Sequence, residues 1–507
     1  MQASEEERDV AAREAQRVGA LIVGTGFAGL GMAIRLKQAG IDDFVVLERA
    51  DDVGGTWRDN SYPGCMCDVP SHLYSFSFAP KPDWTCTYPA QGEIWTYLRD
   101  CAEAFGVMPH IRFNSALREA RWDADTSLWR VESERGSFLA RFLVLGVGPL
   151  SDPKTPDLPG LKGFSGTVFH SARWRHDHDL RGERVAVVGT GASAIQFVPQ
   201  IQPKVAHLDL FQRTPAWVLP HPNRDLTRAE QWLSRTLPAA QRVRRAGIYV
   251  GREWFILGFA YNPRLMTIAE RAARKHLERQ VPDPELRARL TPEYRIGCKR
   301  ILISNDYYPS LTRPNVDVVT AGIREVRQRS VVDTDGVERA VDTIIFGTGF
   351  RVTDPPSAAA VRGASGASLA DVWRGSPQAY LGTSIAGFPN MFFLAGPNTG
   401  LGHTSVVYMI ESQINYVMDC FRAMRRSGAA VLDVKQSAQD AYNAAVQERM
   451  KSTVWSTGGC ASWYIDANGR NSTLWPTFTF AFRRRAARFD PAAYTLAPAA
   501  GAAAAAA

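Results

Sequence analysis

The stretch that decides the fold of this chain is Ala20-Leu21-Ile22-Val23-Gly24-Thr25-Gly26-Phe27-Ala28-Gly29. Its short apolar run predicts a buried parallel strand, and a Gly-x-Gly-x-x-Gly turn follows at once. Helical sequence runs from Leu30 to Gln38, and Phe44–Leu47 predicts a second strand that ends at Glu48. A strand–helix–strand unit with an acidic residue about twenty positions beyond its glycines predicts a dinucleotide-binding site.

Each residue type in this unit suits the ligand. Gly24 permits the tight turn, and Gly26 lets the backbone approach a pyrophosphate whose charge faces the start of the helix. Gly29 allows the helix to pack closely on the strand, and Glu48 can accept hydrogen bonds from a ribose diol. The alternative, a purely structural glycine turn, is the weaker interpretation because strand, helix and Glu48 are all in register.

A second unit of the same kind begins at Arg184–Val188, a predicted strand. It continues through the loop Gly189-Thr190-Gly191-Ala192-Ser193-Ala194 to a strand at Leu208–Phe211. Where the first unit has Glu48, this unit has Gln212-Arg213-Thr214. A cation and a hydroxyl are suited to a 2′-phosphate, so the sequence predicts NADPH in preference to NADH. The alternative is an exposed arginine at a strand end.

Composition limits the class of protein. A chain of 507 residues suggests two or three domains, and no run of eighteen apolar residues occurs that would predict a membrane span. Seven cysteines, an odd count, fit a reducing compartment and no disulfide framework, and we expect a cytoplasmic protein. The net charge of +8 is spread over dispersed basic residues apart from Arg483-Arg484-Arg485, so we predict no nucleic-acid partner.

The order of elements predicts an α/β protein with two Rossmann-like dinucleotide-binding domains and a helical insertion. Val361 to Ala370 is small and polar and predicts a loop, and Cys65 and Cys67 are too close in sequence for a favourable disulfide. The predicted divisions are an N-terminal extension (1–18), a discontinuous first domain (19–150 and 386–495), a second domain (151–221 and 295–385), a helical insertion (222–294) and an alanine-rich tail (496–507).

Between the two units lies Phe164-x-Gly166-x-x-x-His170-x-x-x-Trp174, placed by the sequence in the linker. This segment resembles the fingerprint of the Baeyer–Villiger monooxygenases, flavoproteins that insert oxygen beside a ketone carbonyl. Arg175 departs from the pattern, because the family usually has Pro or Asp there. The resemblance implies that His170 acts through the coupling of the domains, and no proton-transfer role is assigned to it. The alternative is a packed linker histidine.

Further motifs carry the resemblance over residues 19 to 485. Gly54-Gly55-Thr56-Trp57 with Tyr62-Pro63-Gly64 and Asp68 is similar to the family's flavin loop, and Lys299-Arg300 is similar to a basic pair after the insertion. Trp463 lies where relatives place a tryptophan against the nicotinamide cofactor. The resemblance implies FAD on the first unit, held by Gly24, Gly26, Phe27, Gly29, Glu48, Gly55, Thr56, Trp57, Tyr62 and Asp68. It implies NADP on the second, held by Gly189, Thr190, Gly191, Ala192, Ser193, Gln196, Arg213, Thr214, Lys299, Arg300 and Trp463.

The resemblance also implies the reaction. A peroxide formed on the reduced flavin attacks a ketone to give an ester or lactone, with O2 and a small ketone as substrates. Arg300 is the candidate for stabilising the anionic charge, because arginine keeps its charge when desolvated, and Asp68 would orient it. Two alternatives stay open: oxidation of sulfur or nitrogen substrates, as in the flavin-containing monooxygenases, and a flavin- and NADPH-binding redox sensor without oxygenase activity. We predict no metal site, and a monomer or weak homo-oligomer.

Overall fold

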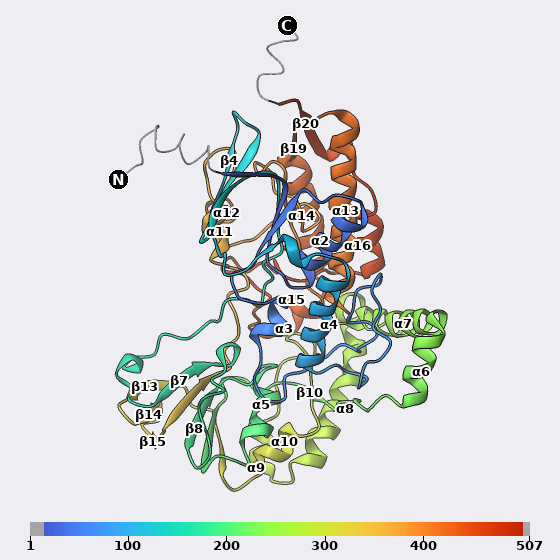
Figure 1. Ribbon diagram of the computed structural model, residues 1–507. Coiled ribbons are helices and arrows are strands. Elements are labelled where there is room, and N and C mark those ends of the chain that lie inside the picture. The colour runs from blue at the N-terminus through green and yellow to red at the C-terminus, as the bar shows by residue number, and fades with distance from the viewer. Residues whose placement is uncertain (1–14, 500–507) are drawn as a thin grey trace.

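The structure, a computed structural model, describes residues 15–499. Two separate β-sheets with their helices form the upper and lower parts of the molecule, and a group of helices projects from one side (Figure 1). Both ends of the described chain lie at the upper part. None of the described helices is long and apolar enough to cross a membrane.

The first sheet has the strand order β17-β4-β5-β6-β1-β2-β3, with β18 paired to β6. Its centre is parallel, with β1 between β2 and β6, whereas β4, β5 and β6 pair antiparallel. Residues 20–23 of β1 are buried on both faces, which explains why they are continuously apolar. The strands are β1 (Gln16–Val23), β2 (Phe44–Leu47), β3 (Ile111–Arg112), β4 (Leu117–Asp123), β5 (Leu128–Ser133), β6 (Gly136–Leu145), β17 (Val361–Arg362) and β18 (Met391–Phe393).

Helices cover this sheet through one large apolar core. The helix α2 (Phe27–Gln38) presents Leu30 and Ile34 to this core, which it shares with Ile410 and Ile414 of α13 (Val406–Ser427). The remaining elements of this part are α3 (Thr56–Asp59), α4 (Gln91–Ala104), α11 (Ser357–Ala360), α12 (Leu369–Trp373), α14 (Gln436–Met450), α15 (Val454–Thr457), α16 (Thr479–Arg485), β19 (Val431–Val434) and β20 (Tyr494–Ala497).

The second sheet is wholly parallel, in the order β12-β9-β8-β16-β7. Its main core forms between the strands and two helices, with Val185, Leu208 and Phe197 fully buried. Its strands are β7 (Thr167–His170), β8 (Arg184–Val188), β9 (His207–Phe211), β12 (Val316–Val319) and β16 (Thr343–Phe346). The helices are α5 (Ala194–Ile201) and α10 (Tyr307–Leu311), and smaller strands are β10 (Val218–Leu219), β11 (Leu302–Ile303), β13 (Ile323–Arg327), β14 (Ser330–Asp333) and β15 (Glu338–Ala340).

The region expected to be a helical insertion is helical in the structure. It contains α6 (Arg228–Thr236), α7 (Pro238–Glu253), α8 (Met266–Gln280) and α9 (Pro284–Arg289). Thr227 and Glu230 form a reciprocal capping box that fixes the start of α6.

Some sequence predictions differ from the structure. The loop predicted at 361–370 is wrong at both ends, because Val361 lies in β17 and Leu369 begins α12, and both side chains are fully buried. The chain thus returns to the first sheet by residue 361, before the expected boundary at 386. Gln16–Val18, expected in the N-terminal extension, belong to β1, and residues 496–497 belong to β20; residues 1–14 and 500–507 of these two terminal predictions lie outside the described residues.

The cysteines gave one result that the sequence did not predict. Cys298 and Cys460, 162 residues apart in sequence, form a disulfide. Cys65 and Cys67 are both free and buried, in agreement with the expectation that they are too close in sequence for a favourable disulfide. The expectation of no disulfide framework therefore needs correction at one pair, which sequence spacing could not reveal.

Candidate functional site

The first glycine loop forms a backbone cradle at the carboxyl end of β1. Gly24 has a φ of +98°, and a Cβ on Gly29 would lie 1.8 Å from the Gly24 carbonyl oxygen. Gly55 also has a positive φ, and its Cβ would approach the Gly26 Cα to 3.0 Å. The two predicted loops therefore meet through bare backbone, which leaves backbone N–H groups accessible to a pyrophosphate. This geometry fits a dinucleotide.

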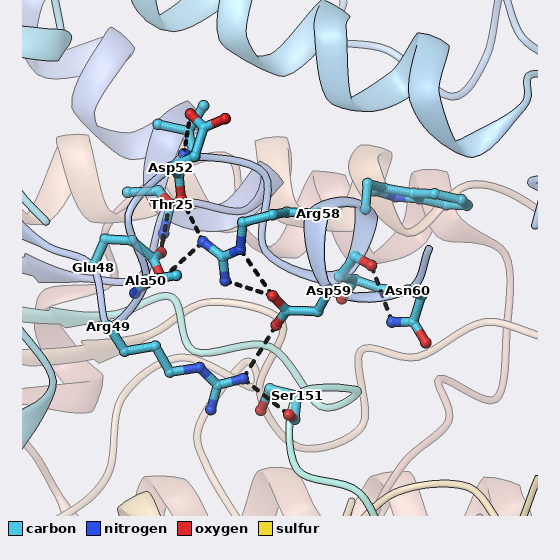
Figure 2. Close-up of polar contacts among 12 residues, drawn as sticks. Thr25, Glu48, Arg49, Ala50, Asp52, Arg58, Asp59, Asn60 and Ser151 are labelled. Carbon is cyan, nitrogen blue, oxygen red and sulfur yellow. Dashed lines mark hydrogen bonds and ion pairs between the residues drawn. The ribbon is translucent and has the colours of Figure 1, made fainter. Parts of the chain in front are cut away.

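Glu48 lies beside this cradle with an exposed fraction of only 3% (Figure 2). One carboxylate oxygen accepts from the backbone N–H and the hydroxyl of Thr25. The other accepts from the Ala50 N–H at 3.0 Å and lies 3.0 Å from an Arg58 nitrogen. A carboxylate has about four acceptor positions, so protein donors fill them. Glu48 thus fixes the glycine loop, and a ribose diol would have to share these contacts.

Arg58 and Arg49 form an ion-pair network that sequence reasoning missed. Arg58 lies between the carboxylates of Glu48 and Asp59, and Arg49 contacts Asp59 and donates to the Ser151 carbonyl (Figure 2). Burial alone would lower the pKa of Arg58, but the two carboxylates outweigh it and raise the pKa. The network ties the first loop to the segment that leaves the first sheet. The signal available in the sequence was the presence of opposite charges, Arg49, Arg58 and Asp59, in the loop that follows β2.

Two predicted residues of the first unit serve the core or the neighbouring loop in this structure. Phe27 is buried, and its ring meets Tyr74 and Phe76 edge-on, each at 5.1 Å between ring centroids. Trp57 is half-buried and donates from its indole N–H to the Tyr74 hydroxyl at 3.0 Å. Thr56 begins the short helix α3, directly after Gly55.

The structure brings Asp68 and Arg300 together, although they are 232 residues apart in sequence. Arg300 Nε and Nη2 donate to the two Asp68 carboxylate oxygens at 2.8 and 2.7 Å, a two-pronged pairing. Arg300 Nη1 donates to the Leu401 carbonyl at 2.8 Å. The side chains are 28% and 30% exposed. The guanidinium is therefore fixed by three contacts while part of it stays accessible.

Electrostatics keep this pair ionised. Burial would raise the pKa of Asp68, but the Arg300 guanidinium and, more weakly, Arg252 lower it below its usual range. Burial would lower the pKa of Arg300, but the Asp68 charge raises it above its usual range. Arg252 also donates to the Asp68 backbone carbonyl at 2.8 Å. Asp68 thus pairs its carboxylate with Arg300 and its backbone carbonyl with Arg252, and these three side chains together carry a net positive charge.

The second glycine loop lies at the carboxyl end of β8. Gly189 has a φ of +107°, and a Cβ there would lie 2.6 Å from the Gly347 carbonyl oxygen. Thr190 is 9% exposed and its hydroxyl donates to the Thr214 carbonyl, whereas a Cβ on Gly191 would meet open space. The turn continues through Ala192 and Ser193 into α5, so the loop is open toward a ligand on the helix side.

Arg213 and Lys299, predicted to share one phosphate, are neighbours in space. Burial lowers the pKa of Lys299, and the nearby Arg213 charge lowers it further. Lys299 also lies over the Tyr294 ring, with its nitrogen 5.0 Å from the ring centroid. Two cations close enough for one of them to lower the pKa of the other favour an anionic ligand between them, because a phosphate offsets the repulsion.

Gln196 and Tyr62, predicted on different cofactors, contact each other. The Tyr62 hydroxyl donates to the Gln196 side-chain oxygen at 3.0 Å, and the Gln196 amide donates to the Met66 carbonyl, also at 3.0 Å. A Cβ on Gly64 would lie 2.7 Å from the Gln196 backbone oxygen. In this structure Gln196 therefore joins the loop of the first unit to the first turns of α5.

The segment Phe164–Trp174 is part of the second sheet, so its placement in a linker was wrong. Residues 167–170 form the edge strand β7, paired in parallel with β16. A Cβ on Gly166 would lie 2.1 Å from the Asp342 carbonyl oxygen, which explains the glycine. Trp174 packs on Phe169 and on Phe197 of α5, at 5.1 and 5.3 Å between ring centroids. Arg175 is exposed and pairs with Asp177. The segment supports the helix that follows the second glycine loop.

His170 ends β7 with a buried side chain. Its Nδ1 accepts a hydrogen bond from the Ala172 N–H at 3.1 Å and caps a turn of 3-10 helix. Burial lowers the pKa of His170 to about 4, so the ring is neutral at pH 7. A neutral, turn-capping imidazole agrees with a structural coupling role, for which no proton transfer is needed.

This pKa predicts a pH-dependent stability. The folded pKa lies below the unfolded value of about 6.5, so the unfolded chain takes up the proton first as the pH falls. Stability is then lost between about pH 6.5 and pH 4. We expect His170 to account for about 2 kcal/mol of the loss between pH 8 and pH 5. His170→Asn keeps a cap acceptor without a titrating ring, and urea unfolding at both pH values should show a correspondingly smaller loss. An identical loss in both proteins would contradict the assignment.

Trp463 lies at the surface with an exposed fraction of 46%, and its ring centroid is 4.4 Å from that of Tyr464. Tyr464 is buried, and burial raises its pKa to about 12, against an opposing effect of the Arg300 charge. Cys460 in the same loop is bonded to Cys298, directly before Lys299. The disulfide thus links the Trp463 loop to the basic pair, and Tyr464, close enough to Arg300 for that charge to affect its pKa, is a site residue that sequence reasoning missed.

Comparisons with known proteins agree with this geometry. Residues 21–236 match a family described as pyridine nucleotide-disulphide oxidoreductase. The chain is 54% identical to a Baeyer–Villiger monooxygenase of Streptomyces coelicolor over 94% of this chain and 92% of that protein. It is 51% identical to one of Pseudomonas aeruginosa, over 94% and 90%. A solved structure, OTEMO in complex with FAD and NADP, is similar with a TM-score of 0.87 and 26% identity, over 96% of this chain and all of that one.

Two dinucleotide cradles on separate sheets and a fixed arginine–acid pair, taken together with these relatives, assign the chain to the flavoprotein monooxygenases with two nucleotide-binding domains. Within that class, the chain belongs to the Baeyer–Villiger monooxygenase family.

Proposed function

We propose that this protein is an FAD- and NADPH-dependent Baeyer–Villiger monooxygenase that inserts one oxygen atom of O2 beside the carbonyl of a small ketone. The observation that carries the proposal is the Asp68–Arg300 pair, in which a partly exposed guanidinium is fixed by three contacts. When bound, FAD supplies the activation of oxygen and NADPH supplies the reducing equivalents. The residues below bind and orient them and stabilise charge.

The two cradles would hold different nucleotides. Gly24, Gly26 and Gly29 would receive the pyrophosphate of FAD, since any side chain at Gly29 would collide with the Gly24 carbonyl. Arg213 and Lys299 would hold the 2′-phosphate of NADP, since an anion between two neighbouring cations would offset their repulsion. We propose that the domain division follows the two sheets, with the return to the first at residue 361.

Arg300 would stabilise the negative charge that develops on the reacting oxygen. A guanidinium held in place before reaction has little reorganisation to undergo, which is why preorganised charges are effective in partly dry sites. Asp68 would aim the guanidinium and, because Arg252 adds a second positive charge nearby, would leave the site net positive. We further expect a cytoplasmic protein that is a monomer or a weak homo-oligomer.

The purified holoenzyme tests the proposal with NADPH, O2 and a panel of ketones and sulfides. We expect ketones to increase NADPH consumption and to give an ester or lactone in amounts close to the NADPH consumed. Sulfoxide or N-oxide without ester would favour the flavin-containing monooxygenase activity. Hydrogen peroxide as the sole product with every substrate would favour a redox protein that is no oxygenase, and either result would overturn the proposal.

A further inference from the structure

The helix α7 exposes an apolar face, whereas its inward face combines polar side chains with Ile248 and Tyr249, which pack against the first core. Among its sixteen residues only Gln241 and Glu253 are buried, whereas Val243 is 73% exposed and Val250 is 52% exposed. Trp254, directly after the helix, is 61% exposed. Positions 243, 250 and 254 are separated by seven and four residues, so they lie on one face of the helix. The apolar face therefore points toward solvent.

Hydrogen bonds hold the polar face of α7 against the rest of the molecule. Gln241 donates to the Lys81 carbonyl at 2.7 Å, and Arg245 donates to the His72 carbonyl at 2.8 Å. At the other end Glu253 accepts from the Thr479 N–H at 2.9 Å and contacts His403. The orientation of the helix is therefore set along its whole length, and the outward apolar face is a fixed feature of the fold.

The apolar face of α7 is the centre of a larger surface. Residues 232–268 contain ten of the sixteen large hydrophobic side chains that are exposed in the described part of the chain, including Trp232, Leu237 and Ile268. Figure 1 shows α6 and α7 at the outer edge of the molecule, away from both termini. A concentration of exposed apolar side chains of this kind marks an interaction surface.

A slightly longer segment around the same helices accounts for most of the net charge of the chain. Residues 224–279 contain twelve lysines and arginines against five aspartates and glutamates, a net charge of +7 compared with +8 for the whole chain. The basic residues were expected to be dispersed along the chain, but most of the net positive charge lies in this one segment. Arg242 on α7 and Arg264, in the turn that precedes α8, are exposed. Arginines around an apolar helix face, with tryptophan on that face, are typical of helices that lie in a lipid interface.

We propose that residues 224–279, with the outer face of α7 at their centre, dock on an anionic phospholipid surface. Charge selects this occupant over a second copy of the chain. A symmetric contact between two copies would bring two surfaces of net charge +7 together, whereas an anionic bilayer attracts the arginines and accepts the valines and the tryptophan. In this arrangement the helices lie on the surface of the bilayer and do not span the bilayer. This inference does not depend on the proposed reaction.

Vesicle flotation tests the proposal with the FAD-loaded enzyme, using phosphatidylglycerol–phosphatidylcholine vesicles and phosphatidylcholine vesicles. We expect binding to the anionic vesicles that weakens with added salt, and much weaker binding to the zwitterionic ones. Val243→Gln/Val250→Gln should lower binding about tenfold or more, because two apolar side chains no longer enter the interface. Arg242→Gln/Arg264→Gln should lower it by roughly fivefold for each arginine removed.

The matched control is Val337→Gln/Val372→Gln, which replaces two valines that are 47% and 41% exposed elsewhere on the molecule. This variant should bind vesicles as the unmodified protein does, and FAD content should be the same in all variants. Absence of binding to anionic vesicles would overturn the proposal, as would equal losses in the two valine pairs. A dimer in solution that Val243→Gln/Val250→Gln dissociates would assign the surface to a second copy instead.

Discussion

Arg300→Ala is expected to bind FAD as the unmodified enzyme does and to lose ester formation by roughly a hundred- to a thousandfold. Removing one preorganised stabiliser of developing negative charge typically costs about 2.7–4 kcal/mol of transition-state stabilisation. FAD binding should survive because the first cradle is built by Gly24, Gly29 and Gly55, none of which contacts Arg300. The measured quantity is the ratio of ester formed to NADPH consumed, which separates charge stabilisation from any effect on reduction.

The contacts of Arg300 allow its charge and its shape to be tested separately. Arg300→Lys keeps a positive charge but cannot donate to both Asp68 oxygens and to Leu401 at once. We expect it to retain a partial ester-to-NADPH ratio, between those of the unmodified enzyme and Arg300→Ala. A native ratio in Arg300→Ala would show that another cation stabilises the charge, and Lys299 would be the next candidate.

The parts of the fold that the sequence predicted are those specified by local spacing. The run Ala20–Val23 and the glycines after it needed no distant information, because a buried parallel strand and a tight turn each restrict the residue types at consecutive positions. The same is true of Gly189 and the strand before it. Val361 failed as a prediction for the opposite reason: a strand of two residues has no period to read, and only pairing with β4 makes it a strand.

The candidate site divides in the same way, between features that local spacing predicts and features that depend on distant contacts. Asp68 and Arg300 were paired through a family resemblance, and no local pattern connects residues 232 positions apart. The Arg300–Leu401 contact, the Arg49–Ser151 contact and the Cys298–Cys460 bond could not be predicted, because each depends on where the folded backbone places two distant segments. Gln196 shows a subtler limit. Its place after the second glycine loop suggested a contact with NADP, which stays a prediction, and no local pattern indicated the hydrogen bonds of its side chain to Tyr62 and Met66.

Arg213→Ala is expected to raise the KM for NADPH by about ten- to a hundredfold and to leave that for NADH nearly unchanged. Loss of one charge-assisted contact costs roughly 1.5–3 kcal/mol of binding free energy. NADH has no 2′-phosphate and therefore makes no such contact with Arg213. Lys299 would keep part of the affinity, because the two cations lie close enough for the Arg213 charge to lower the Lys299 pKa. Arg213→Ala/Lys299→Ala should therefore reduce the preference for NADPH further than either single change.

The matched control is Arg313→Ala, an exposed arginine three residues before β12, at the amino end of the parallel strands, whereas Arg213 follows the carboxyl end of β9. It should leave both KM values unchanged, since the carboxyl ends of parallel strands form the nucleotide edge. The 2′-phosphate contact also predicts that the NADPH effect shrinks at high ionic strength, where salt screens the lost charge. Equal increases in KM for NADPH and NADH in Arg213→Ala would mean that the arginine supports the loop, and the phosphate would then have to be bound elsewhere.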